Sequence, residues 1–271
     1  MQLPQPITSR TNAKVKALRA AFEGRASKPG EIVAIEGATL IGEAVRSGIR
    51  PETVFVRQGS EAVLEGFREL AGVPVVVLSR DVFASAVDTN SPQGLAALVA
   101  IPEVRSGKHY TERGLVLVLE AIQDPGNLGT LLRAAEAFGA SRLLITPETV
   151  NPWSPKALRA SAGSVFRVPV RRMPLNEIGQ WAEDEGIRVY AAVARANGAV
   201  SAIEADFAWP CAVMIGNEGA GLSEAALKIA GERIHIPCMT ESLNAAAAGA
   251  TLMYEAMRQR IVNTIPAGAP R

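Results

Sequence analysis

Apolar residues follow two different rhythms along this chain, and the two rhythms alternate. Residues 115–120 (LVLVLE) are almost continuously apolar, which is typical of a strand buried on both faces of a parallel sheet. Residues 128–139 (LGTLLRAAEAFG) instead repeat apolar positions every three to four residues, which predicts a helix ending at Gly139. Alternation of such runs predicts an α/β fold.

The pattern divides the chain into two α/β domains. A polar stretch with Pro and Gly follows residue 101 and predicts a linker. The first domain is expected over 1–105, the linker over 106–113, the second domain over 114–262 and a flexible tail over 263–271. In the first domain strands are expected at 32–37, 53–57, 73–79 and 95–102, with helices at 11–22, 38–48, 62–72 and 81–88. In the second, strands are expected at 115–120, 142–146, 166–170, 188–194, 211–216 and 233–237, with helices at 128–139, 152–164, 175–186, 222–231 and 242–260.

Composition narrows the function classes. The 271 residues carry 28 Lys and Arg against 27 Asp and Glu, so net charge does not indicate nucleic-acid binding, and basic residues would have to be clustered. Two Cys and two His, without ligand spacing, argue against a metal site and a structural disulfide. No apolar run reaches the roughly 20 residues of a membrane span, and the first residues lack signal-peptide order. A soluble, cytoplasmic protein is expected.

Three loops that follow strands of the second domain are candidates for a ligand site, because ligands of open α/β sheets bind beyond the carboxyl ends of the strands. The first, residues 124–129 (DPGNLG), is either a plain turn in which Asn127 caps the next helix or part of a site. On that helix Arg133 projects away from the apolar stripe and faces solvent or a cleft.

The second loop, residues 217–221 (NEGAG), is glycine-rich, which allows a ligand to approach the backbone. Glu218 within it argues against a triphosphate and favours a ligand with a cationic centre or hydroxyl groups. A tight turn with a solvated Glu218 is the alternative. In the third loop, Ser242 is either a site residue or the N-cap of the last helix.

Basic residues gather in two places. One is the early segment with Arg10, Asn12 as a candidate helix cap, and Lys16; the other is residues 156–166, with Lys156 and Arg159. These residues could contact nucleic-acid phosphates, with a solvated helix face as the alternative.

Four segments in this order, 124–140, 156–170, 213–223 and 234–256, resemble the SpoU branch of the SPOUT RNA methyltransferases over residues of about 115 to 258. Residues 7–16, 32–37 and 89–94 resemble, more loosely, the L30e-like substrate-binding domain common in that family. The resemblance implies a parallel-sheet domain with a deep trefoil knot, a homodimer, and transfer of a methyl group from S-adenosyl-L-methionine to a ribose 2′-hydroxyl without a metal.

The resemblance also assigns site residues. The reactive positions of the family correspond to Asn127, Arg133, Glu218, Ser242 and Asn244. The cofactor would be contacted by Gly216, Asn217, Gly219, Ile236 and Leu243. Arg133 would bind RNA phosphate and either remove the hydroxyl proton or stabilise the forming alkoxide, and the second role is favoured because a neutral guanidine is costly.

Residues 245–248 (AAAA) depart from the family's run, which carries a hydroxyl there. Ribosomal RNA is the favoured substrate, and transfer RNA the alternative. A non-catalytic RNA-binding protein on the same scaffold is the rival from another class, while a Rossmann dehydrogenase is disfavoured because no GxGxxG follows the first strand.

Overall fold

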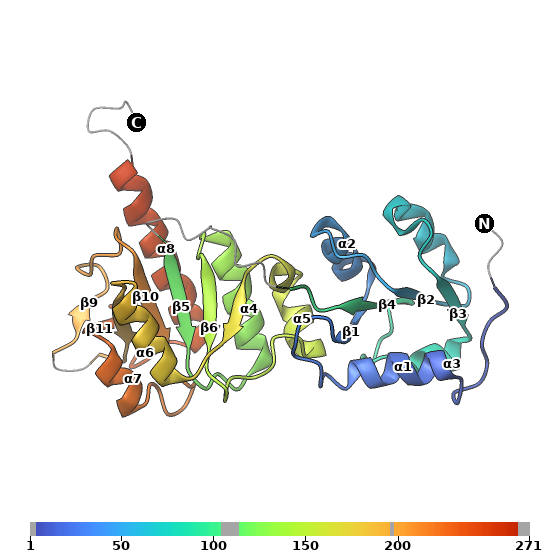
Figure 1. Cartoon of the computed structure of the whole chain (residues 1–271), viewed down its shortest axis with the longest axis horizontal. Coiled ribbons are helices and arrows are strands. Elements are labelled where there is room, and N and C mark those ends of the chain that lie inside the picture. The colour runs from blue at the N-terminus through green and yellow to red at the C-terminus, as the bar shows by residue number, and fades with distance from the viewer. Residues whose placement is uncertain (1–3, 104–113, 196–197, 265–271) are drawn as a thin grey trace. The chain divides into compact units, whose positions relative to one another are not determined.

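The computed structural model describes residues 4–103, 114–195 and 198–264, and the chain forms two compact α/β units. The first unit comprises residues 1–104 and 151–167, and the second comprises 105–150 and 168–271. Figure 1 shows one twisted sheet with helices in each unit. The α/β prediction is confirmed. The predicted linker, 106–113, lies outside the described residues, as does the predicted tail except for 263 and 264, which end the last helix.

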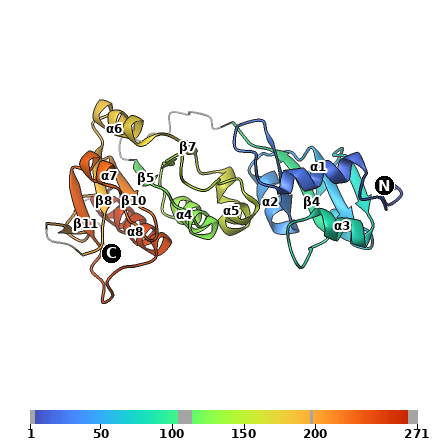
Figure 2. The same cartoon turned by 90° about the horizontal axis from the view of Figure 1, so that it is seen from below.

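The first unit is built on a four-stranded sheet in the order β1-β4-β2-β3. Its elements in chain order are α1 (Ala13–Phe22), β1 (Ile32–Glu36), α2 (Ala38–Arg46), β2 (Thr53–Arg57), β3 (Val75–Leu78), α3 (Arg80–Ala86) and β4 (Leu95–Ala100). Helices α1 and α3 lie side by side against the sheet, as Figure 2 also shows, and bury Leu18 and Phe83 against Phe55. Asn12 caps α1 as expected, because its side chain accepts from the amide of Lys14 at 2.9 Å.

The helix predicted over 62–72 is wrong. The structure has two short 3-10 helices there, η1 (Glu61–Gly66) and η2 (Arg68–Leu70), separated at Phe67. Leu70 is the only buried residue in these two 3-10 helices, so tertiary packing does not support a longer helix. Gly66 in the middle further weakens it.

Residues 151–167 belong to the first unit, whereas the sequence pattern placed them in the second. They form α5 (Pro155–Ser161) and η3 (Ser164–Phe166). Asn151 fixes the start of the segment, since its Nδ2 donates to the carbonyls of Gly24 at 3.0 Å and Ala26 at 2.7 Å. Because these contacts join residues more than 100 positions apart, periodicity could not reveal them.

The second unit holds a sheet in the order β7-β6-β5-β10-β8-β11-β9, in which every pairing is parallel. Its strands are β5 (Leu115–Leu119), β6 (Arg142–Ile145), β7 (Val170–Arg172), β8 (Arg188–Ala192), β9 (Val200–Ser201), β10 (Cys211–Ile215) and β11 (Glu232–His235). Its helices are α4 (Pro125–Ala137), α6 (Leu175–Asp184), α7 (Glu224–Ile229) and α8 (Ala245–Thr264). Strand β9 is too short to be seen in the sequence pattern. The strand predicted over 166–170 is misplaced, because β7 begins only at Val170 and Phe166 ends the 3-10 helix η3.

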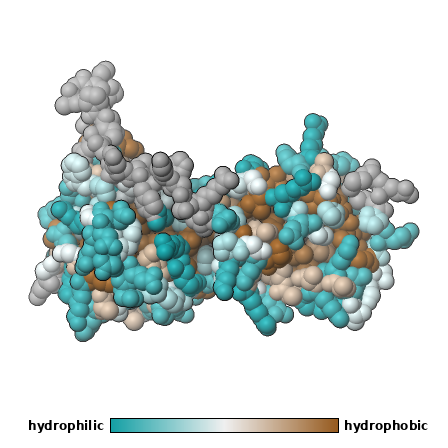
Figure 3. Space-filling view, viewed as in Figure 1, coloured by the Kyte–Doolittle hydropathy of each residue, from teal (hydrophilic) through white to brown (hydrophobic). Residues whose placement is uncertain are grey.

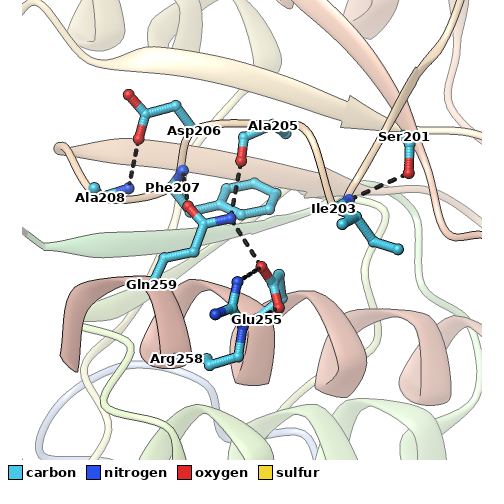
Figure 4. A network of polar contacts seen from close by, with 9 residues as sticks. All are labelled: Ser201, Ile203, Ala205, Asp206, Phe207, Ala208, Glu255, Arg258 and Gln259. Atoms are coloured by element: carbon cyan, nitrogen blue, oxygen red, sulfur yellow. Dashed lines mark hydrogen bonds and ion pairs between the residues drawn. The ribbon is translucent and has the colours of Figure 1, made fainter. Parts of the chain in front are cut away.

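Helix α8 is tied to the segment between β9 and β10 by one glutamine, as Figure 4 shows. The side-chain oxygen of Gln259 accepts from the amide of Phe207 at 2.8 Å, and its Nε2 donates to the carbonyl of Ala205 at 2.9 Å. Glu255 accepts from the same Nε2 and from Arg258. These bonds satisfy backbone groups of a segment without regular structure.

The surface is mixed. In the view of Figure 3, hydrophilic residues cover most of the second unit, and hydrophobic residues show through over the first. No helix in the described part of the chain has the length and apolar character needed to cross a membrane.

Candidate active site

A cavity of about 520 Å³ lies in the second unit, beyond the carboxyl ends of β8, β10 and β11. Its walls come from the segments 192–195, 215–222 and 236–243 and from the first turn of α8. All five predicted cofactor residues line it: Gly216, Asn217, Gly219, Ile236 and Leu243. Three strand-following loops therefore meet at one edge of the parallel sheet, where ligands of such sheets bind.

Gly216 in this wall packs against the backbone of its own loop. A Cβ atom at Gly216 would lie 2.3 Å from the carbonyl carbon of Gly221 and 2.4 Å from the amide nitrogen of Leu222. These are backbone atoms, which cannot move aside as a flexible side chain could. The loop thus folds back on its own start, and only glycine fits there.

Asn217 sets the shape of the loop. Its Oδ1 accepts from the amides of Gly219 and Ala220, both at 2.9 Å, and its Nδ2 donates to the carbonyl of Ala121 at 2.9 Å. Ala121 follows β5 and has a positive φ of 53°, a conformation that L-residues rarely adopt. The loop of residues 216–222, called the cofactor loop below, and the turn after β5 are thereby joined through the side chain of Asn217.

A relay of side chains links this loop to α4 and α8. Asn127 Nδ2 donates to Glu218 Oε1 at 2.8 Å, and Asn244 Nδ2 donates to Asn127 Oδ1 at 3.1 Å. Because an ionised carboxylate only accepts, Glu218 fixes which way the amide of Asn127 faces, and Asn127 in turn fixes Asn244. The relay ends at α8, where Asn244 Oδ1 accepts from the amides of Ala246 and Ala247.

Glu218 is held in its ionised form. Partial burial acts to raise the pKa of its carboxyl, but the hydrogen bonds from Asn127 and from backbone amides, including those of Gln123 and Asp124, outweigh it and lower the pKa below the ordinary value. A carboxylate with three such donors is suited to orienting its neighbours and is poorly suited to taking up a proton.

Two capping alternatives from the sequence are wrong. The cap of α4 is Asp124, whose carboxylate accepts from the amides of Gly126 and Asn127, so Asn127 lies inside the helix with its side chain engaged in the relay. The last helix is capped by Asn244, which leaves Ser242 as an exposed residue of the cavity wall. Asp supplies a stronger acceptor than Asn at the cap, because its charge also favours the helix N-terminus.

Arg133 lies on the exposed face of α4, opposite Leu131, Leu132 and Ala135, as the periodicity predicts. It is not among the residues that line the cavity. The reactive positions therefore fall into three groups: Glu218 and Ser242 in the wall, Asn127 and Asn244 joined to the wall through hydrogen bonds, and Arg133 outside it.

The predicted RNA-binding residues all belong to the first unit. Arg10 and Lys16 are exposed at the start of the chain and on α1, while the side chain of Asn12 caps that helix. On α5, Lys156 is exposed, and the guanidinium of Arg159 donates to Asp88 Oδ2 at 3.2 Å from both terminal nitrogens. The pairing of Arg159 with an acid reduces its availability for phosphate.

The sequence interpretation missed further residues of the cavity wall. Arg195, Cys238 and Glu241 line it. Arg195 follows β8 at its carboxyl end, so the rule that selected the other loops could have found it. Within the described ranges, no group of three His, Cys, Asp or Glu side chains could hold a metal ion.

Comparisons with known proteins agree with this geometry. Residues 114–254 match the SpoU rRNA Methylase family, and residues 12–97 match an MRM3-like substrate binding domain. The chain is 34% identical to the 23S rRNA (guanosine(2553)-2'-O)-methyltransferase RlmP of Bacillus subtilis, over 92% of this chain and 97% of that protein. It is 30% identical to the 23S rRNA (uridine(2479)-2'-O)-methyltransferase of Streptomyces viridochromogenes, over 82% of this chain and 85% of that protein.

Solved structures extend the likeness to both units. The SpoU methyltransferase AviRb from Streptomyces viridochromogenes, in complex with AdoMet, superposes with a TM-score of 0.81 at 27% identity, covering 92% of this chain and 98% of that chain. An AdoMet-bound rRNA methyltransferase from Sinorhizobium meliloti gives 0.77 at 29% identity, covering 94% and 97%. The family match covers more than half of the chain and the relatives span nearly all of it, so this chain belongs to the SpoU rRNA methylase family.

Proposed function

We propose that the protein transfers a methyl group from S-adenosyl-L-methionine to a ribose 2′-hydroxyl of ribosomal RNA. The observation that carries the proposal is the junction of the glycine-lined cavity with the Glu218–Asn127–Asn244 relay. The glycines of the cavity wall allow a ligand to contact the backbone directly. The relay places oriented polar groups beside the cavity. The 23S rRNA 2'-O-methyltransferases of Bacillus subtilis and Streptomyces viridochromogenes, to which the chain is similar, support the choice of ribose and of ribosomal RNA.

The cavity fits the cofactor on grounds of shape and charge. Gly216, Gly219 and Gly221 line the cavity without side chains to fill it, and Glu218 brings a negative charge to the wall. That charge suits a ligand with a cationic centre. When bound, S-adenosyl-L-methionine supplies an electrophilic methyl group on its sulfonium.

The residues of this chain would contribute mainly position and charge. Asn127 and Ser242 present polar groups with which to orient the ribose, and alignment of the reacting oxygen is itself a large part of catalysis. Arg133, with its guanidinium exposed, would bind RNA phosphate and stabilise negative charge developing on the 2′-oxygen. Glu218 serves to hold Asn127.

The position of Arg133 supports a homodimer. It lies outside the cavity wall of its own chain, which is the arrangement expected if the site is completed across an interface between two copies. We further propose the trefoil knot of the family in the second unit, and the cytoplasm as the place where ribosomal RNA would be met. The first unit would bind the RNA, in keeping with its substrate-binding-domain match.

The test uses the full chain, labelled S-adenosyl-L-methionine and unmodified ribosomal RNA or transfer RNA, with Arg133→Ala alongside. Methylated ribose is scored by nucleoside analysis. We expect product from ribosomal RNA, and at least ~100-fold less from the variant, or ~2.7 kcal/mol of barrier. If only transfer RNA were methylated, transfer RNA would replace ribosomal RNA as the proposed substrate. Absence of both transfer and cofactor binding would leave a non-catalytic RNA-binding protein.

A further inference from the structure

A buried carboxylate lies beside the cofactor loop without being part of the cavity wall. Glu120 follows β5 and is 9% exposed. Its two oxygens accept from a single residue: Oε2 from the amide of Ser223 at 2.9 Å, and Oε1 from the Ser223 hydroxyl at 2.6 Å. None of the ion pairs found in the described part of the chain involves it. A buried carboxylate is costly unless hydrogen-bonded, so these two bonds hold strongly.

Glu120 also holds the other end of the same loop. Its backbone amide donates to the carbonyl of Ile215 at 2.9 Å, directly before Gly216. Residues 216–222, all of which line the cavity, therefore begin and end on one residue. The neighbouring carbonyl of Ala121 holds the middle of the loop through Asn217.

Ser223 also caps the helix that follows the cofactor loop. It is the N-cap of α7, and its hydroxyl oxygen accepts from the amide of Ala226 at 3.1 Å while its proton goes to Glu120. A hydroxyl can donate and accept at once. The end of the cofactor loop, the start of α7 and the end of β5 are thus joined at one oxygen atom.

We propose that Glu120 and Ser223 are positioning residues, which hold residues 216–222 in the conformation that binds the cofactor. The inference rests on the proposed function. Glu120 acts through Ser223 and the backbone and does not line the cavity. Without the contacts of Glu120 with Ser223, residues 216–222 would become ordered only when the cofactor binds. The entropic cost of that ordering would appear as a weaker affinity for the cofactor.

Ser223→Ala should therefore raise the Kd for S-adenosyl-L-methionine about tenfold or more, and tenfold corresponds to about 1.4 kcal/mol. Glu120→Gln should raise it as well, because an amide can accept from only one of the two donors of Ser223. Ser223→Thr keeps the hydroxyl and should restore affinity to within about threefold of wild type.

The matched control is Ser154→Ala. Ser154 caps α5 in the first unit through a bond from the amide of Ala157, so this variant removes a serine cap of the same kind away from the cavity. It should lower thermal stability without changing the Kd. Calorimetric titration of the full-length proteins with S-adenosyl-L-methionine, below the unfolding temperature of each, gives the comparison.

The double variant Glu120→Gln, Ser223→Ala should bind the cofactor no more weakly than Ser223→Ala alone. The reason is that both substitutions disrupt the same contact, the one between Glu120 and Ser223. Equal Kd values for wild type and both single variants would refute the positioning role of Glu120 and Ser223 while leaving the proposed function in place. Additive losses in the double variant would also overturn it, since the residues would then act separately. A wild-type protein that does not bind the cofactor would instead sink the proposed function itself.

Discussion

Replacing Asn127 with Asp changes one atom of the relay and tests its electrostatics directly. Asn127 Nδ2 lies 2.8 Å from Glu218 Oε1, so Asn127→Asp would place a second carboxylate oxygen against the first. Two unit charges about 4 Å apart repel by ~1 kcal/mol in bulk water and ~4 kcal/mol at an effective dielectric constant of about 20. A hydrogen bond to a charged group, worth about 1.5–3 kcal/mol, is lost as well. Both side chains are partly exposed, so we expect a loss of about 2–4 kcal/mol in unfolding free energy at about pH 8.

The pH dependence of this loss in unfolding free energy distinguishes charge repulsion from the simple loss of a hydrogen bond. In the wild type the pKa of Glu218 is lowered in the folded state, so its contribution to stability is present above the ordinary carboxyl pKa and is lost as the pH falls through the folded value. In Asn127→Asp, two adjacent carboxyls would share one proton, and the pKa of the pair would rise in the folded state. The folded variant then binds more protons than the unfolded chain, so its stability should increase as the pH falls from about 8 to about 5.

The assay is urea unfolding of wild type, Asn127→Asp and Asn127→Ala across that pH range. Asn127→Ala removes the hydrogen bond without adding a charge, so its deficit relative to wild type should be almost independent of pH. A deficit of Asn127→Asp that stays constant over the range would refute the electrostatic reasoning, and with it the claim that Glu218 is held ionised by Asn127.

Two further predictions address the cavity and the RNA-binding unit. Gly216→Ala should weaken cofactor binding at least ~100-fold by calorimetry, because its Cβ would meet the backbone of Gly221 at 2.3 Å, whereas Gly231→Ala, whose Cβ would have one neighbour at 3.9 Å, should bind normally. Lys16→Ala should lower the slope of log K for RNA against log salt by about 0.7–0.9, as loss of one phosphate contact does. Arg159→Ala should change that slope less, because its guanidinium is paired with Asp88, and an equal change would argue that the pair opens on RNA.

The sequence predicts the central strands of the second unit well, because buried parallel strands such as β5 and β10 are apolar runs. It misses the edge strands β7 and β9, which are short and partly exposed. It also predicts the cavity wall, because the site lies where the strand-following loops must meet. The sequence does not show which side chains pair over long distances, since Asn127 donates to Glu218 across 91 positions and Glu120 accepts from Ser223 across 103. The cap of α4 by Asp124 is a local contact, and here the sequence interpretation chose the wrong one of two nearby capping residues. The failed helix at 62–72 has the same origin, since periodicity was present but a packing partner was not.

The discontinuity of the first unit has a consequence for how the chain folds during synthesis. Domains usually fold as units from the N-terminus while the ribosome is still elongating the chain. Here the first unit contains residues 151–167, so it is incomplete until β5, α4 and β6 of the second unit have already emerged. A nascent chain stalled just after residue 104 would leave β1 without its contacts to α5 and Gly24 without Asn151. The two units must therefore mature in an interleaved order, and a fragment cut at residue 104 should be protease-sensitive where the full chain is not.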